Sequence, residues 1–114
     1  MNTIDVKKKD IIYDKLCYGI LVDKVEVLSM YVSITDNVAT ITYNGRVDLF
    51  RGFTGALLLK ELLSYVLFTI DGVIEVRTYF DDNNNNYGLS NYCKQFNCNE
   101  KRLEDGSICY FIKK

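Results

Sequence analysis

The chain has 114 residues, a formal net charge of −1 and 25% charged residues. This length fits one domain with a buried core, so we expect residues 1–114 to form a single domain. The near-neutral charge gives no electrostatic basis for binding nucleic acid or a membrane surface, and we expect neither. No apolar stretch reaches the ~20 residues that span a bilayer, and the N-terminus lacks the apolar region of a signal peptide. The sequence therefore predicts a cytoplasmic protein.

The chain contains no histidine, which narrows the chemistry it can perform. Its four cysteines, Cys17, Cys93, Cys98 and Cys109, form no C-x-x-C pair, so no zinc ligand set is complete and we expect no metal. Histidine is also the commonest general base and the partner of most serine and cysteine nucleophiles. Any catalysis must therefore use carboxylates, tyrosines, water or backbone groups.

Residues 3–21 are expected to form the first helix. The apolar positions of this segment mostly recur at helical spacing with charged residues between them: Ile4, Ile11, Ile12, Leu16, Cys17 and Ile20. We expect this helix to end near Gly19.

Residues 24–45 are expected to form an antiparallel hairpin. Residues 24–35 alternate between two faces, one of which carries Leu28, Met30 and Val32. A two-residue turn signal, Asp36-Asn37, then precedes a second β-branched run over residues 38–45. Two alternating runs joined by such a turn are typical of a hairpin.

The stretch over residues 51–69, RGFTGALLLKELLSYVLFT, predicts a buried helix of about five turns. Only Lys60, Glu61 and Ser64 in its middle are clearly polar, so most of its circumference should be buried. Two glycines stand at its beginning, and Asp71-Gly72 suits its C-terminal cap.

The remaining chain predicts a central strand over residues 73–80, a polar loop, a short helix over residues 87–96 and two strands, 97–103 and 107–112, joined by Glu104-Asp105-Gly106. The polar loop, DDNNNN, does not meet EF-hand spacing. The order is α-β-β-α-β-α-β-β, which places the chain in the α/β (α+β) class with a mixed sheet.

The loop over residues 51–56 is a candidate anion site. A loop that opens a helix presents unpaired backbone N–H groups, and the helix dipole adds partial positive charge, so it can hold a phosphate or pyrophosphate. Neither the Walker pattern nor the dinucleotide G-x-G-x-x-G pattern is present. The glycines alone do not distinguish an ordinary loop from an anion site.

Three runs, RGFTGALLLKELLSYV, EVRTYFDDNNNN and LSNYCKQFNCNEKRLEDGSICYFIKK, give the chain a resemblance to a known family. Residues 47–114 resemble the C-terminal two-thirds of the GCN5-related N-acetyltransferase (GNAT) family. The resemblance implies acetyl-CoA as co-substrate, with transfer of its acetyl group to an unknown amine acceptor by direct attack. It also implies a GNAT-like fold with a shortened N-terminal part, which lacks the first strand and one of the two helices on the acceptor side.

The same resemblance implies roles for individual residues. In the family, an R/Q-x-x-G-x-G/A loop binds the acetyl-CoA pyrophosphate, which here corresponds to Arg51, Gly52, Phe53, Thr54, Gly55 and Ala56. Asn85 or a neighbour fits the asparagine that follows the next strand, and Tyr92 fits the tyrosine that protonates the departing thiolate. Glu26, on the first strand of the hairpin, is the candidate for a base that acts through water.

A second resemblance competes with the first. Residues 11–82 look like the GerMN module of germination and sporulation proteins, a non-catalytic interaction domain with a hairpin, a long helix and a strand. An unrelated small interaction protein is a third alternative, and a truncated sheet edge could hold a second copy or a protein partner. The acetyltransferase hypothesis predicts that the strand over residues 73–80 diverges from the strand ending near Gly45. The GerMN hypothesis predicts that these two strands pair without a gap.

Overall fold

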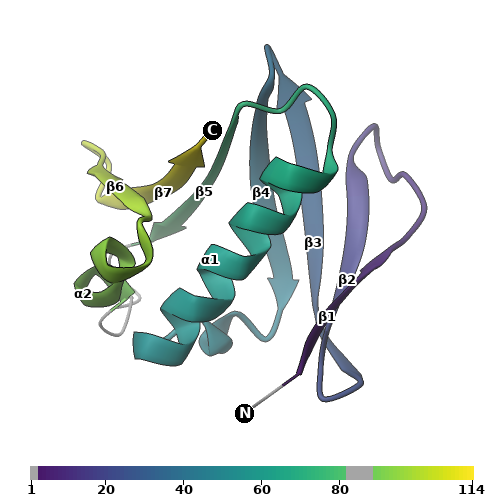
Figure 1. Ribbon diagram of the computed structural model, residues 1–114, viewed down its shortest axis with the longest axis horizontal. Coiled ribbons are helices and arrows are strands. Elements are labelled where there is room, and N and C mark those ends of the chain that lie inside the picture. The colour runs from purple at the N-terminus through teal and green to yellow at the C-terminus, as the bar shows by residue number, and fades with distance from the viewer. Residues whose placement is uncertain (1–2, 82–88) are drawn as a thin grey trace.

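A single mixed sheet of seven strands organises the computed structural model, which describes residues 3–81 and 89–114 (Figure 1). The strand order across the sheet is β1-β2-β3-β4-β5-β7-β6. The strands are β1 (Ile4–Lys8), β2 (Leu16–Val22), β3 (Val25–Thr35), β4 (Val38–Gly45), β5 (Glu75–Asp81), β6 (Asn99–Arg102) and β7 (Ser107–Lys113). The helices are η1 (Val47–Leu49), α1 (Gly52–Thr69), α2 (Leu89–Cys93) and η3 (Lys94–Phe96).

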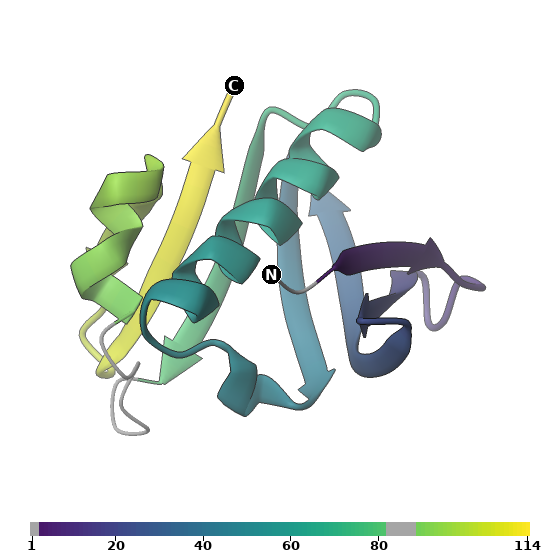
Figure 2. The ribbon, with the colours of Figure 1, turned by 60° about the horizontal axis from the view of Figure 1, so that its bottom comes forward.

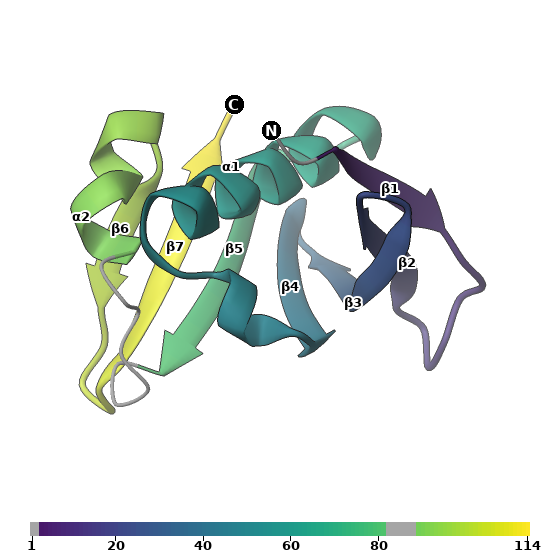
Figure 3. The same ribbon diagram turned by 90° about the horizontal axis from the view of Figure 1, so that it is seen from below.

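The described helices α1 and α2 lie on the same face of the sheet, and no described helix covers the other face (Figure 3). Neighbouring strands pair antiparallel throughout, except that β4 and β5 are parallel. The prediction of an α/β fold with a mixed sheet is therefore confirmed. From β3 onward the order of strands and α-helices is also the predicted one, with β5 in the centre between β4 and β7.

The predicted helix over residues 3–21 is wrong, because this segment forms β1 and β2, an antiparallel pair. Ile11 and Ile12, which contributed to the helical spacing, lie in the connection between the strands and are 66% and 41% exposed. Tyr18 and Ile20 are buried at alternate positions of β2 instead, and the Tyr18 ring packs edge-on against Tyr65 of α1. The first strand, which the resemblance left out, is present, and residues 3–24 contain no helix.

The predicted hairpin is confirmed, and its turn explains its register. β3 and β4 pair from Thr35↔Val38 to the far end of β4. Asp36 and Asn37 both have positive φ, 53° and 66°, which is the backbone of the type I′ turn that suits the twist of two antiparallel strands.

The core lies between α1 and the sheet. Eight residues of α1 are buried, including Leu59, Leu62, Leu63 and Val66. By length and composition alone α1 could cross a membrane, with a mean hydropathy of 1.3. Its buried stripe packs against β5 and β7, which is how the core helix of a globular domain behaves. All four cysteines are free and buried.

Candidate functional site

The parallel strands β4 and β5 separate towards their carboxyl ends, which lie at the same end of the sheet as the beginning of α1 (Figure 2). Their ladder has four pairs, of which the last is Ile41↔Thr78. Beyond it, residues 42–45 of β4 keep their pairing with β3, and residues 79–81 of β5 keep theirs with β7. We call the point where the ladder ends the splay. Ligands of open α/β sheets bind outside the carboxyl ends of parallel strands, so the splay is the candidate site.

A side-chain hydrogen bond marks the end of the ladder. Thr78 Oγ1 donates to the backbone carbonyl of Ile41 at 3.0 Å, and both residues are 1% exposed. A buried carbonyl needs a hydrogen-bond donor. Because the Thr78 hydroxyl provides one, β5 can leave β4 at this residue.

Aromatic rings fill the space beside the splay on the face that carries α1. Tyr43 of β4 and Phe80 of β5 lie one on each side of it, and the Phe50 ring contacts both, at centroid distances of 4.7 and 5.3 Å. Tyr110 of β7 contacts Phe80 at 5.9 Å. We call these four residues the splay cluster. Phe50 is 3% exposed, so the connection from β4 to α1 is anchored in the splay.

Tyr43 is the unusual member of the splay cluster. Its hydroxyl is buried and has no hydrogen-bond partner within the part of the chain that the structure describes. Burial raises the pKa of Tyr43 above the usual value. The hydroxyl of Tyr110, by contrast, shares a 2.8 Å hydrogen bond with Ser90 Oγ of α2. An orphaned buried hydroxyl is costly, and it is available to a ligand that enters the splay.

The beginning of α1 presents unpaired backbone amides near the same cluster. The first helical hydrogen bond runs from the Gly55 amide to the Arg51 carbonyl at 2.8 Å, so the amides of Gly52, Phe53 and Thr54 precede it. No side chain in the described ranges caps this end, and no acidic residue lies in the first turn. Gly52 has a φ of +57°, which glycine adopts without strain. This end of α1 is electropositive and suited to an anion.

The second glycine of the predicted loop has a different purpose. A Cβ atom at Gly55 would lie 2.4 Å from the Phe50 carbonyl carbon. Gly55 is therefore needed for the close approach of α1 to the segment that anchors in the splay. Ala56 is 2% exposed and belongs to the core, whereas the Thr54 side chain is exposed beside an apolar pocket of about 430 Å³.

The structure brings Tyr92 to the predicted loop. Its ring packs edge-on against Phe53, with centroids 5.7 Å apart, and Phe53 also contacts Phe96 at 5.3 Å. Helix α2 and η3 are thereby attached to the first turn of α1. Figure 1 shows α2 and the beginning of α1 at the same end of the molecule.

Glu26 is not brought to the loop. Its carboxylate is 2.7 Å from Lys9 Nζ and lies over Gly19, where a Cβ atom would be 2.3 Å from Glu26 Oε1. Since Tyr18 and Ile20, on either side of that glycine, face α1, Glu26 is on the face without helices. It lies near the carboxyl end of β4, because Gly45 pairs with Leu28.

The remaining predicted residue, Asn85, lies outside the described residues. Sequence reasoning missed Tyr43, Phe50, Thr78 and Phe80. For Tyr43 and Phe80, the local signal was an aromatic residue near the carboxyl end of each parallel strand, in TITYNG and EVRTYF.

No protein-family model and no curated protein matches the sequence. Solved structures do match. Campylobacter jejuni N-acetyltransferase PseH in complex with acetyl coenzyme A has a TM-score of 0.62 at 16% identity, over 90% of this chain and 70% of that chain. A Bacillus subtilis acetyltransferase in complex with CoA has a TM-score of 0.64 at 10% identity, over 98% of this chain and 99% of that one. PaiA N-acetyltransferase from Thermoplasma acidophilum, with coenzyme A, reaches 0.57 at 20% identity, over 88% and 61%.

The fold is thus that of the GNAT acetyltransferases, one of which, from Bacillus anthracis, is also similar at a TM-score of 0.55. The predicted resemblance to this family is confirmed at the level of the fold. The shortened N-terminal part is compatible with that fold, because the Bacillus subtilis acetyltransferase matches over nearly its whole length. The GerMN alternative required β4 and β5 to pair without a gap, and their ladder ends after four pairs, so this alternative is not supported.

Proposed function

We propose that the chain is an acetyl-CoA-dependent N-acetyltransferase whose co-substrate binds at the splay. The observation that carries the proposal is that three features lie together at the carboxyl ends of β4 and β5. The β4–β5 ladder ends there at Ile41 and Thr78, α1 begins there with uncapped amides, and the buried hydroxyl of Tyr43 has no partner there among the described residues. Solved structures with the same fold contain acetyl-CoA or CoA.

In this proposal the amides of Gly52, Phe53 and Thr54 hold the pyrophosphate, and the Arg51 cation adds positive charge to the same end of α1. Gly55 and Ala56 support the loop by packing closely within the protein and do not bind the co-substrate themselves. The pantetheine arm enters the splay, where it offers amide groups to the Tyr43 hydroxyl. Asn85 keeps its proposed role as a further cofactor ligand.

The co-substrate supplies a thioester carbonyl carbon as electrophile. The acceptor's neutral amine attacks this carbon, the new N–C bond forms as the C–S bond breaks, and the leaving sulfur takes a proton. We assign that proton to the Tyr92 hydroxyl, the role that the family resemblance gives it; the Tyr92 ring packs against Phe53 of the loop. The amine loses its proton to Glu26 through water, with Lys9 holding that carboxylate in place.

Isothermal titration with acetyl-CoA tests the proposal directly. We expect micromolar binding, and slow acetyl transfer to a panel of amines measured by release of free CoA thiol. If millimolar acetyl-CoA gives neither heat nor a thermal shift, the enzymatic function is excluded and the chain retains only the fold.

A further inference from the structure

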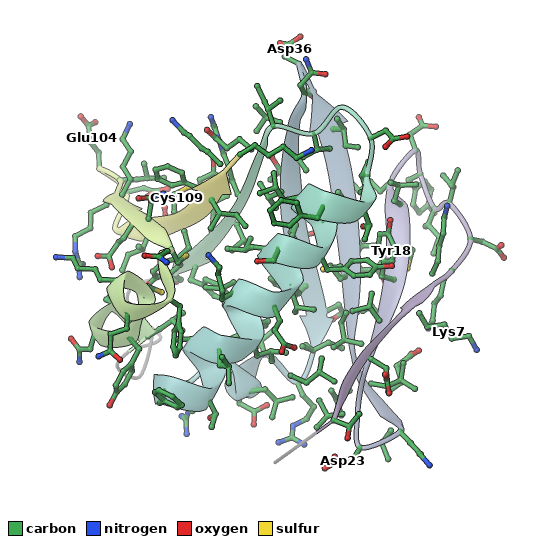
Figure 4. All side chains as sticks on the ribbon, viewed as in Figure 1. Lys7, Tyr18, Asp23, Asp36, Glu104 and Cys109 are labelled. Atoms are coloured by element: carbon green, nitrogen blue, oxygen red, sulfur yellow. The ribbon has the colours of Figure 1, made fainter. Side chains whose placement is uncertain are left out.

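The face of the sheet without helices contains a groove of about 330 Å³ over β5, β7 and β6. The groove residues of β5 are Glu75, Arg77 and Tyr79. They alternate with the residues of β5 that face α1, so the groove and the beginning of α1 lie on opposite faces of the sheet. Cys109 of β7, labelled in Figure 4, is opposite Tyr79 and lines the same groove.

The groove is positively charged in a chain whose formal net charge is −1. Arg77, Lys101 and Lys113 line it together with one carboxylate, Glu75. Glu75 is 8% exposed, and its carboxylate is paired with two of these cations. Arg77 Nε hydrogen bonds to it, and Lys113 Nζ is 3.7 Å from its Oε1.

Lys101 contributes a cation to the groove that is available for a ligand. Its side chain is exposed on β6, and the structure gives it no acidic partner within residues 3–81 and 89–114. The groove is also partly apolar, since the Phe111 ring lines it and Lys113 Nζ lies 5.7 Å from the ring centroid. A ligand with a negative group and a short aliphatic part would match this surface.

The groove begins at the splay. Tyr79 is the first residue of β5 after the last ladder pair, so a thioester that passes between the diverging strands reaches this face beside Tyr79. Arg77 is two residues along the same strand, about 7 Å away, and Lys101 is two strands across, about 10 Å away. Arg77 and Tyr79 line the same groove, so the charged part of the groove continues to the splay.

We propose that this groove binds the acetyl acceptor, and that the acceptor is a small aliphatic amine with an anionic group, carboxylate or phosphate, about 7 to 10 Å from its nitrogen. The inference rests on the proposed function for the identity of the ligand as acceptor. Arg77 and Lys101 bind the anionic group and the aliphatic part lies along Phe111. The amine then lies at Tyr79, where the thioester arrives.

Binding of amines to the protein without CoA tests the groove separately from the enzyme. The probes are 6-aminohexanoate for the carboxylate, 4-aminobutyl phosphate for the phosphate, and hexylamine as the amine without an anionic group. Amide resonances of isotope-labelled protein report where each one binds. We expect at least one anionic amine to shift resonances of β5, β6 and β7, with hexylamine at least about tenfold weaker.

Lys101→Glu and Lys8→Glu form the matched pair of variants, because both reverse an exposed lysine on an edge strand. Lys101→Glu should weaken binding of the anionic amine about tenfold, and Lys8→Glu should leave it unchanged. Equal affinity for hexylamine, shifts outside these strands, or unchanged binding to Lys101→Glu would overturn the inference. If acetyl-CoA binds and hexylamine is acetylated as fast as the anionic amines, the proposed acetyltransferase function is retained and the proposed acceptor class is wrong. If the anionic amines bind and acetyl-CoA does not, the groove is retained as a binding site and the proposed acetyltransferase function is wrong.

Discussion

Thr78 donates a hydrogen bond from its side-chain hydroxyl to the backbone carbonyl of Ile41, at 3.0 Å, at the last pair of the only parallel ladder among the described strands. In a regular ladder that carbonyl would receive a backbone amide of β5. A side-chain donor meets the same requirement while the backbone of β5 moves away. One hydroxyl thus stabilises the separation of two strands in the middle of a sheet.

Thr78→Val should lower the free energy of unfolding by about 1–3 kcal/mol, because the buried Ile41 carbonyl loses its donor while the side chain keeps its shape. Thr78→Ser retains the hydroxyl and is the control, which loses only a methyl group. Urea unfolding of the three proteins measures the difference. Equal stability of Thr78→Val and the wild type would mean that water or a backbone amide satisfies the carbonyl.

Gly55→Ala should destabilise the protein although the site is helical. At an unobstructed helical position alanine is more favourable than glycine by about 0.5–1 kcal/mol. Here the new Cβ would lie 2.4 Å from the Phe50 carbonyl carbon, and relief of that clash should cost about 1–3 kcal/mol.

Gly106→Ala is the comparison for this substitution. Gly106 has a φ of +90° and no atom within 4 Å of its Cβ position, so alanine there costs only the strain of the left-handed backbone, about 1–2 kcal/mol. Acetyl-CoA affinity separates the two variants further. It should fall in Gly55→Ala, which displaces the loop, and stay unchanged in Gly106→Ala.

The sequence predicted the elements whose pattern is local. The buried helix, the Asp36-Asn37 turn and the final strands each follow from neighbouring residues. The N-terminal helix failed because one window joined two strands and their connection. In that window Ile11 and Ile12 fall at helical spacing from the other apolar residues only by chance. The segment forms strands because β2 pairs with β3.

The candidate site shows the same limit. The two glycines before α1 were visible in the sequence because they adjoin a strong helical pattern. The Thr78 hydroxyl and the Ile41 carbonyl, however, are 37 residues apart, and only the register of β4 against β5 brings them together. The splay cluster is equally non-local, so no pattern within one segment could specify it.

Thr54→Glu should separate stability from binding. A glutamate in the first turn of α1 interacts favourably with the helix dipole, which should raise the free energy of unfolding by about 0.3–1 kcal/mol. The same charge would repel a pyrophosphate at the neighbouring amides, so acetyl-CoA affinity should fall at least about tenfold. Thr54→Gln has the same size without the charge and should bind nearly as the wild type does. Equal loss in both variants would indicate a steric effect and argue against an anion site.

Tyr92→Phe should slow acetyl transfer about 100-fold or more while the dissociation constant of acetyl-CoA stays nearly constant. The substitution removes only the hydroxyl and keeps the ring that packs against Phe53. Single-turnover rates and titrations on the same preparation distinguish the two effects. Tyr65→Phe, in the C-terminal half of α1, is the control and should retain the rate. An unchanged rate in Tyr92→Phe would remove its role as proton donor.

Tyr43→Phe should have opposite effects on the free and the bound protein. The Tyr43 hydroxyl is buried without a partner in the described chain, so its removal should raise the free energy of unfolding by about 1–3 kcal/mol. If that hydroxyl bonds to the co-substrate, the same change weakens acetyl-CoA binding about fivefold to tenfold. Urea unfolding and titration calorimetry measure the two quantities. A variant with increased stability and unchanged affinity would show that the hydroxyl does not contact the co-substrate.

The pH dependence of stability gives a further readout of this hydroxyl. Burial raises the pKa of Tyr43 in the folded state above its unfolded value of about 10. The associated stability is therefore fully present below about pH 10 and is lost as the pH rises through the folded pKa, because the unfolded chain releases the proton first. Burial also raises the pKa of Tyr18 and Tyr110, so Tyr43→Phe should reduce this alkaline loss without abolishing it. Identical alkaline unfolding of variant and wild type would show that the Tyr43 hydroxyl reaches water in solution. That result would contradict the proposal that this hydroxyl is buried without a partner and available to a ligand in the splay.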